Sequence, residues 1–156
     1  MCPQAFQDNY PDDLSHCYGC GRLNPHGLHI KSYWDGDEAV CRFNPQPYHT
    51  AIPGYVYGGL IASLIDCHST GTASAAAHAK AQEDGASPKT PRFVTASLHV
   101  NYLRPTPIDD VLEVRAVVKE MTGRKVVIAS RLMAGGQVCA TGEVVAVEMP
   151  KHLMPE

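Results

Sequence analysis

The stretch GYVYGGLIASLIDCHSTGTA, residues 54–73, consists of apolar and small residues and holds a single carboxylate, Asp66. Between Arg42 and Lys80 this aspartate is the only Asp, Glu, Lys or Arg. The pattern predicts one long helix from residue 55 to about residue 79. Positions three, four and seven residues from Asp66 share its side of such a helix. All of them are small: Gly59, Ala62, Ser63, Ser69, Thr70 and Ala73. A ligand or a second backbone can therefore approach this carboxylate closely.

The bulk composition is that of a globular protein. The chain has 156 residues, of which 44% are hydrophobic and 19% are charged, and its formal net charge is −3. These values predict one domain with a hydrophobic core and argue against general nucleic-acid binding. No apolar run reaches membrane-spanning length, and the N-terminus has neither a basic nor an apolar signal region. We therefore expect a cytoplasmic protein that does not insert into membranes.

Turn signals divide much of the remaining chain into strands. Asp35 and Gly36 separate two strand-like runs, residues 28–34 and 38–44, which predicts a hairpin. After a polar loop at residues 81–91, four more strands are expected around residues 92–103, 110–121, 125–134 and 137–149. The tight turns between the later strands imply antiparallel neighbours. The sequence therefore predicts an α+β fold, in which an antiparallel sheet of about six strands wraps one long central helix.

The ends of the chain differ in character from this central part. Residues 1–27 are rich in Pro, Asp, Asn and Gly and predict an irregular N-terminal arm. We expect residues 28–150 to form the single domain and residues 151–156 to form a C-terminal tail. On the helix, four apolar side chains should contact the sheet: Leu60, Ile61, Leu64 and Ile65.

The surroundings of Asp66 favour a chemical role over that of an ordinary surface residue or local hydrogen bonder. Burial among small and apolar groups raises the pKa of a carboxyl, which suits a base or a nucleophile. Gly58 and Gly59 lie two turns earlier, where open backbone amides and the helix dipole can stabilise an oxyanion. Eight residues of helix separate Gly58 from Asp66 by roughly 12 Å, so an antiparallel helix of a second copy must complete the site.

Four motifs in this order resemble one known family. GYVYGGLIASLID resembles the segment x-x-V-H-G-G-x-x-A-T-L-x-D of hotdog-fold acyl-CoA thioesterases of the PaaI-like group. CYGCGRLNPHGLHI is similar to the lead-in C-F-x-C-G-x-x-N-P-x-G-L-x-x of one branch, and NYLRPTP to the strand end Y-L-R-P-x-P. EMTGRKVVIA resembles the turn E-x-x-G-R-K. The resemblance covers residues 17 to about 147.

The resemblance implies a hotdog fold that dimerises edge to edge, as a homodimer or dimer of dimers, with two active sites at the interface. It also implies hydrolysis of an acyl-CoA thioester without a cofactor. By position, Asp66 is the catalytic carboxylate, acting as base or nucleophile. Gly58 supplies the N–H that polarises the carbonyl, with Gly59 beside it. Thr70, one turn further on, orients the water or the carboxylate.

Two positions depart from the family pattern. Tyr57 replaces the usual His before the glycine pair, and Ala51 replaces an Asn or Gln. The Tyr57 hydroxyl and His49 are the candidates to restore these polar contacts to substrate. If they do not, the chain is a hotdog protein that binds acyl-CoA or a similar ligand without turnover. A hydratase or dehydratase is a further alternative, which commonly needs a His beside the Asp.

Basic residues outside the helix are candidates for binding the phosphates of coenzyme A. Arg124 and Lys125 follow Gly123 in a predicted turn, and a guanidinium or ammonium group there suits a phosphate. Arg104, before Pro105, is a weaker candidate for the same contact. The alternative is that the turn at Gly123 is a solvated hairpin end that binds no phosphate.

The Cys17-x-x-Cys20 pair suggests a zinc site, but zinc usually takes four ligands in two close pairs. His16 and His26 lie nearby in sequence, and no second pair follows. We therefore expect no metal and assign this pair to packing of the arm. The other cysteines in apolar stretches are expected to be small core residues: Cys41, Cys67 and Cys139.

Overall fold

A computed structural model describes residues 2–86 and 89–156; residues 1, 87 and 88, which fall in the expected arm and polar loop, lie outside the described residues. Six strands and one long helix account for most of the described chain. In chain order they are β1 (Ser32–Asp35), β2 (Glu38–Phe43), α1 (Gly58–Glu83), β3 (Phe93–Tyr102), β4 (Leu112–Thr122), β5 (Lys125–Ala134) and β6 (Gln137–Glu148). Short 3₁₀ turns precede and follow them: η1 (Phe6–Asn9), η2 (Asp12–Leu14) and η3 (Lys151–Leu153).

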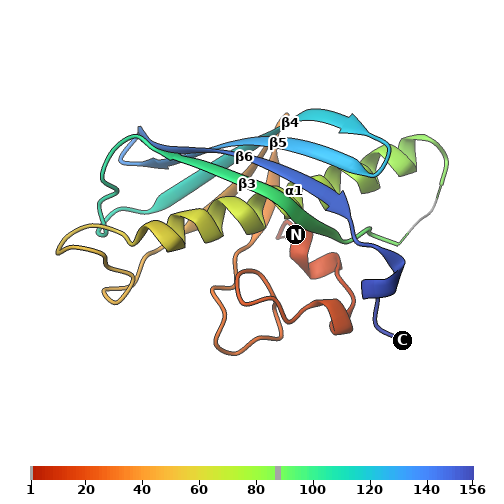
Figure 1. Ribbon diagram of the computed structural model, residues 1–156, viewed down its shortest axis with the longest axis horizontal. Helices are drawn as coiled ribbons and strands as arrows, with labels where there is room; N and C mark the ends of the chain where they lie inside the picture. Colours follow the sequence, from red (N-terminus) through yellow and green to blue (C-terminus); the bar gives the residue numbers. More distant parts are fainter. Residues whose placement is uncertain (1, 87–88) are drawn as a thin grey trace.

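The six strands form one antiparallel sheet in the order β1-β2-β4-β5-β6-β3, and the sheet curves around α1 (Figure 1). Gly36 and Gly123 stand in two of its hairpin turns with φ of 62° and 59°, a conformation that favours glycine. One long helix held by a six-stranded antiparallel sheet confirms the predicted α+β class and the hotdog fold.

The helix begins and ends later than the sequence predicted. Tyr55 and Val56 form isolated β-bridges, to Pro107 and Thr50 respectively, so their backbones are extended and α1 starts at Gly58. At the other end the helix continues through Glu83, and Gly85, two residues further on, has a φ of 80°. Among the described residues, no helix is both long and apolar enough to cross a bilayer.

The predicted apolar side of α1 is confirmed as the side that meets the sheet. The side chains of Leu60, Ile61, Leu64 and Ile65 are at most 4% exposed. Gly142 of β6 permits the close approach, because a Cβ there would stand 2.5 Å from Ile65 Cγ2. The small residues around Asp66 are less accessible to a ligand or a second chain than the sequence predicted. Ser69 and Ala73 are fully buried, and Ser69 Oγ lies 2.8 Å from Ser130 Oγ of β5.

The N-terminal arm packs on the side of α1 that the sheet leaves uncovered (Figure 1, red and orange). Ala5, Phe6 and Tyr10 are buried there. Gly71 of the helix gives the arm room, since a Cβ at this position would stand 2.6 Å from Gln7 Nε2. The arm therefore covers the Gly71 side of α1, for which the sequence predicted no contact.

Candidate active site

Asp66 lies half-buried on α1 and faces strand β3. Thr95 of β3 donates a hydrogen bond from its hydroxyl to Asp66 Oδ1. Burial raises the pKa of the Asp66 carboxyl above its usual range, and the Thr95 hydrogen bond opposes that change. A register shift in the β3–β6 pairing follows Thr95 directly, and such bulges often re-aim a side chain beside a functional site. Sequence analysis did not select Thr95, because nothing local links it to a helix residue 29 positions away.

Thr70 does not orient the carboxylate in this structure. Its hydroxyl donates to the backbone carbonyls of Asp66 and Cys67, at 3.2 and 3.3 Å, and its side chain is buried. A threonine one turn along a helix commonly bonds back to the carbonyl four residues earlier, and that bond occupies its only proton.

His68 points away from Asp66, because two residues of helix turn its side chain by about 200°. It is fully buried, with Nδ1 2.8 Å from Ser32 Oγ and Nε2 3.2 Å from the Ala39 carbonyl oxygen. Burial disfavours the charged imidazolium and lowers the pKa of His68 to about 4. Among the described residues of one chain, no histidine ring bonds to the Asp66 carboxylate.

The first amides of α1 are open. Tyr57 is the N-cap residue and makes no side-chain cap, and neither Gly58 nor Gly59 donates its N–H to a carbonyl of the described backbone. The Tyr57 ring lies against Gly59, where a Cβ would meet the phenol oxygen at 2.5 Å. Tyr102 of β3 donates from its hydroxyl to the Gly58 carbonyl over 2.8 Å, which fixes this end of the helix to the strand.

A groove of about 330 Å³ opens beside the start of α1. Arg104 lines it together with Gly58, so the structure brings these two predicted residues together. The remaining lining is largely apolar: Ala51, Ile52, Tyr55, Val56, Ile61, Tyr102, Leu103, Pro105 and Thr106. Arg104 also contacts Gln137 Oε1 at 3.2 Å and is exposed enough to reach a ligand.

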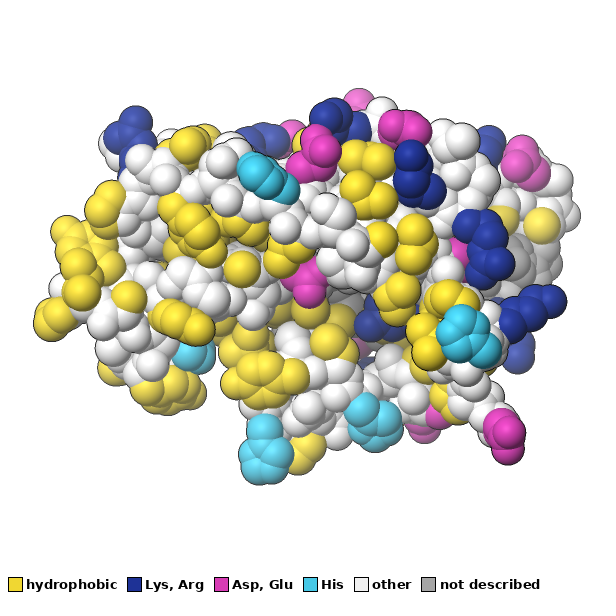
Figure 2. Space-filling view, in the orientation of Figure 1, with side chains coloured by type: hydrophobic (Ala, Val, Ile, Leu, Met, Phe, Trp, Pro, Cys, Tyr) yellow, Lys and Arg dark blue, Asp and Glu magenta, His cyan; other side chains and the backbone are white. Residues whose placement is uncertain are grey.

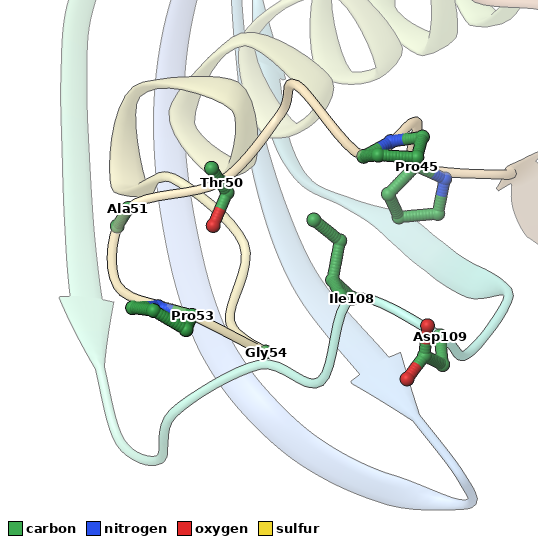
Figure 3. A pocket seen from close by; sticks show the side chains of 8 residues that line it. Pro45, Thr50, Ala51, Pro53, Gly54, Ile108 and Asp109 are labelled. Carbon is green, nitrogen blue, oxygen red and sulfur yellow. The ribbon is translucent and has the colours of Figure 1, made fainter.

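A second hollow of about 480 Å³ lies between the loop that precedes α1 and the β3–β4 connection (Figure 3). Its walls are Pro45, Pro47, Thr50, Ala51, Pro53, Gly54, Ile108 and Asp109. Although it is the larger of the two, it holds neither Asp66 nor Gly58. The groove beside Gly58 is therefore the better candidate for a substrate.

His49 is held inside the loop before α1. Its Nδ1 accepts a hydrogen bond from the Gln46 amide at 2.9 Å, and its carbonyl accepts one from the Tyr57 amide at 2.9 Å. The ring packs between Phe43 and Tyr48, and the resulting burial lowers its pKa. His49 thus helps to position Tyr57, the residue that precedes Gly58 and Gly59.

Arg124 and Lys125 lie far from Gly58 within one chain. Lys125 pairs with Val147 of β6, whereas Tyr102, which contacts Gly58, pairs with Ala140. Val147 and Ala140 are seven residues apart on β6, which is about 23 Å along the strand. Arg124 approaches the Glu148 and Met149 carbonyls at 3.5 and 3.4 Å, and Lys125 lies 3.5 Å from Glu120.

Exposed hydrophobic side chains gather around the loop before α1 and the end of β3. Figure 2 shows them over the left end of this face, while Lys and Arg side chains lie along its upper and right-hand margins. The members of this patch are Tyr48, Ile52, Tyr55, Tyr57, Tyr102 and Leu103. Such a patch commonly marks a ligand or protein interface.

The cysteine pair of the arm meets a third cysteine on α1. The Sγ atoms of Cys17, Cys20 and Cys67 all lie within 4.8 Å of one another. Sequence analysis had placed Cys67 in the core, and it is buried, but its sulfur faces the arm rather than the sheet. The sequence offered no signal for this meeting, because 50 residues separate Cys17 from Cys67.

Residues 53–147 match the model of the Thioesterase superfamily. The crystal structure of a thioesterase superfamily protein from Shewanella loihica PV-4 is 49% identical, covers 90% of this chain and 100% of that chain, and gives a TM-score of 0.68. The Escherichia coli PaaI protein has the same fold at 16% identity, with 79% of this chain and 81% of that chain covered and a TM-score of 0.64.

Curated relatives carry a more specific name. Acyl-coenzyme A thioesterase THEM4 of Xenopus laevis is 36% identical over 87 residues, which are 56% of this chain and 33% of that protein. THEM4 of Bos taurus is 27% identical over 95 residues, or 61% of this chain and 33% of that protein. The chain spans about a third of the length of these relatives. From the matched model and fold, the chain belongs to the thioesterase superfamily.

Proposed function

We propose that this chain hydrolyses acyl-CoA thioesters to a carboxylic acid and CoA, at sites shared between two copies of the chain. One observation carries the proposal. Asp66 and the open amides of Gly58 and Gly59 stand on the same helix, roughly 12 Å apart by helical rise. One carbonyl cannot reach both groups within a single chain, so the donors of one copy must serve the carboxylate of the other.

The sheet supports this pairing of two copies. Strand β3 is an edge strand of ten residues, most of them exposed, and an unpaired edge of this length is a template for another strand. If two β3 strands pair antiparallel about a point between Leu98 and His99, Thr95 lies opposite Tyr102 of the second copy. Thr95 contacts Asp66 and Tyr102 contacts Gly58, so this register unites the two halves of the site.

The chemistry follows from these groups. The Gly58 amide donates to the thioester oxygen and stabilises the negative charge that develops there. Asp66, its carboxylate oriented by Thr95, removes a proton from the attacking water, and that proton then leaves with the CoA thiolate. Direct attack by the carboxylate, followed by hydrolysis of the anhydride, uses the same geometry.

The basic residues suit the CoA part of the substrate. Arg104 lines the groove beside Gly58, where a guanidinium can pair with a phosphate. Arg124 and Lys125 stand at the opposite end of the sheet from Gly58, so they can reach that substrate only from the second copy. We propose no membrane or nucleic-acid partner, and the cytoplasmic location stays a prediction.

Ligand binding without turnover is the second candidate function. The Tyr57 ring against Gly59 favours it, because an aromatic ring there narrows access to the amides that polarise the carbonyl. A hydrolysis assay over short, long and aromatic acyl-CoAs separates the two candidates. Release of CoA supports the enzyme, whereas saturable binding without CoA release supports the binding protein.

Asp66→Asn tests the catalytic assignment. The change is nearly isosteric, but an amide can neither accept the proton of water nor attack as a carboxylate does. We expect kcat to fall by about 10²–10⁴-fold, with KM largely kept. The thermal midpoint is measured on the same preparation. A folded Asn variant with wild-type kcat contradicts the role of Asp66.

A further inference from the structure

Three sulfur atoms surround one point between the N-terminal arm and α1. Cys17 Sγ and Cys67 Sγ lie 3.9 Å apart, and Cys20 Sγ completes a triangle with no side above 4.8 Å. Two thiolates on one tetrahedral zinc ion, each about 2.3 Å from the metal, lie about 3.8 Å from one another. A disulfide needs its sulfurs about 2.05 Å apart. The observed spacing therefore matches shared ligation better than a covalent bridge.

We propose that Cys17, Cys20 and Cys67 bind one Zn²⁺ as thiolates, with a water molecule in the fourth position. Sulfur donors select zinc, copper(I) or iron–sulfur clusters, and clusters of the last kind usually need four cysteines. Zinc takes three thiolates and one water readily, because it imposes no geometry from its filled d shell. Cys17 is half-buried, which leaves one side of the site accessible to solvent.

The local backbone is shaped to bring the arm pair onto the helix. The Gly21 amide donates to the Cys17 carbonyl at 2.7 Å and closes the turn that carries both cysteines. Gly19 lies so close to the helix that a Cβ would stand 2.3 Å from Cys67 Sγ. The two-residue spacing of Cys17 and Cys20 is the spacing found in structural zinc loops. The third ligand comes from α1, which explains why no second pair appears in the sequence.

The groups around the sulfurs suit a charged metal–thiolate centre. Tyr10 is 4% exposed, and its hydroxyl makes no hydrogen bond to the described residues. Burial is the main cause that raises the pKa of Tyr10, so its phenol stays protonated at neutral pH. The Arg92 guanidinium stands 4.5 Å from the Tyr10 ring and balances the net negative charge of zinc with three thiolates.

Metal analysis of the full chain, purified without an affinity tag that binds metals, tests the site. We expect about one zinc per chain, and after removal by a chelator, Co²⁺ should give the thiolate-to-cobalt charge-transfer absorption of several sulfur ligands. Cys17→Ser and Cys20→Ser should each lose most of the zinc. Cys41→Ala and Cys139→Ala, which remove buried thiols elsewhere, are the matched controls and should keep it.

Measurements on the wild-type chain test the zinc site even if a serine variant does not fold. A folded wild-type protein that carries no zinc and gives no charge-transfer band with Co²⁺ overturns the proposal. So does a Cys17–Cys67 disulfide found by mass spectrometry in protein that was never exposed to reductant. Full zinc content in folded Cys17→Ser and Cys20→Ser variants overturns the assignment as well. These readouts do not depend on thioesterase activity, so the zinc site and the proposed function stand or fall separately.

Discussion

Asp66 receives its hydrogen bond from Thr95, 29 residues further along the chain. At the scale of single residues, this contact holds the carboxylate, whereas the Thr70 hydroxyl donates to the helix backbone. A hydroxyl that bonds a carboxylate fixes its rotamer and stabilises its charge, which a hydroxyl bonded to carbonyls cannot do. The two threonines therefore offer a matched pair of substitutions.

Thr95→Val removes the hydroxyl at almost constant volume. A hydrogen bond to a charged group contributes about 1.5–3 kcal/mol, so kcat should fall by roughly tenfold or more while KM changes little. Steady-state kinetics on one acyl-CoA measure both parameters. Thr70→Val is the control and should lower the thermal midpoint but leave kcat near wild type. A larger kcat loss in Thr70→Val than in Thr95→Val contradicts the assignment.

At the scale of elements, the fit between α1 and the sheet depends on close approach at Gly142. The helix carries Ile65 directly against this glycine, and the fully buried side chains around it leave no room for an extra methyl group. On the opposite side, the arm uses Gly71 in the same way. Gly142 and Gly71 thus allow the sheet and the N-terminal arm to pack closely against α1.

Gly142→Ala should destabilise the protein by about 1–3 kcal/mol, because the new methyl group overlaps Ile65 Cγ2. Chemical denaturation gives the free energy of unfolding. The double variant Gly142→Ala with Ile65→Ala should cost less than the sum of the two single changes, since the second removes the atom that clashes. Simple additivity of the two free-energy changes would argue against this contact as the cause.

Strands β1, β2, β4 and β5 are linked on their outer face by ion pairs. Glu38 contacts Arg131 at 2.7 Å and Arg115 at 3.1 Å, and Arg115 also contacts Asp35 at 2.9 Å. The hydrogen bond from Arg131 is the main cause that lowers the pKa of Glu38, and Arg115 adds to it. A carboxyl with a lowered folded pKa stabilises the protein above its unfolded pKa, near 4.3, and loses that contribution as the pH falls through the folded pKa.

Glu38→Gln should therefore lower the free energy of unfolding at neutral pH by about 0.2–1 kcal/mol, a modest value because the pairs are partly exposed. The difference from wild type should shrink toward zero as the pH falls below the unfolded pKa and through the lowered folded pKa of Glu38. Urea unfolding at several pH values measures it, and added salt should also reduce it. A difference that stays constant with pH would assign the loss to packing.

At the scale of the whole molecule, the chain holds both halves of the proposed site but keeps them apart. The Gly58 amide is at the start of α1 with the exposed hydrophobic patch, and Asp66 stands two turns on at the β3 edge. A two-fold axis through that edge would create two identical sites. This arrangement is testable without a structure of the dimer. One inactivating substitution can be placed in one copy of the chain and a second in the other copy.

Mixing two inactive variants tests the shared site. Gly58→Pro removes the amide proton and adds a pyrrolidine ring, whose Cβ would meet the Tyr102 ring at an ordinary 3.5 Å. Proline is accepted at the first helical position, and Tyr57 before it is already extended, with φ −60° and ψ 131°. Each variant alone should be inactive. In mixed dimers with Asp66→Asn, one of the two sites combines an intact Asp66 with an intact Gly58, so co-expression should recover about a quarter of wild-type activity.

Two controls accompany the mixture. Each variant co-expressed with itself should stay inactive, and sedimentation should show dimers throughout. No recovery in proven mixed dimers, or an active folded monomer, would place the whole site within one chain and reject the sharing of sites.

The sequence by itself determined the helix, the hairpins and the position of the lone carboxylate. Periodicity places Leu60, Ile61, Leu64 and Ile65 on one side of a helix, and turn residues such as Gly36 and Gly123 mark where strands reverse. These features depend on neighbours within a few residues, which is why they can be read locally. The start of α1 was misplaced by three residues, because the bridges of Tyr55 and Val56 involve a distant segment.

Tertiary structure alone decided which side chains meet across long separations. The register of β3 against the sheet brings Thr95 to Asp66, and the path of the arm brings Cys17 and Cys20 to Cys67. It also places the arm against Gly71 of the helix, a contact that the sequence did not predict. Such meetings depend on the packing of the whole chain around one core, and local propensity carries no information about them.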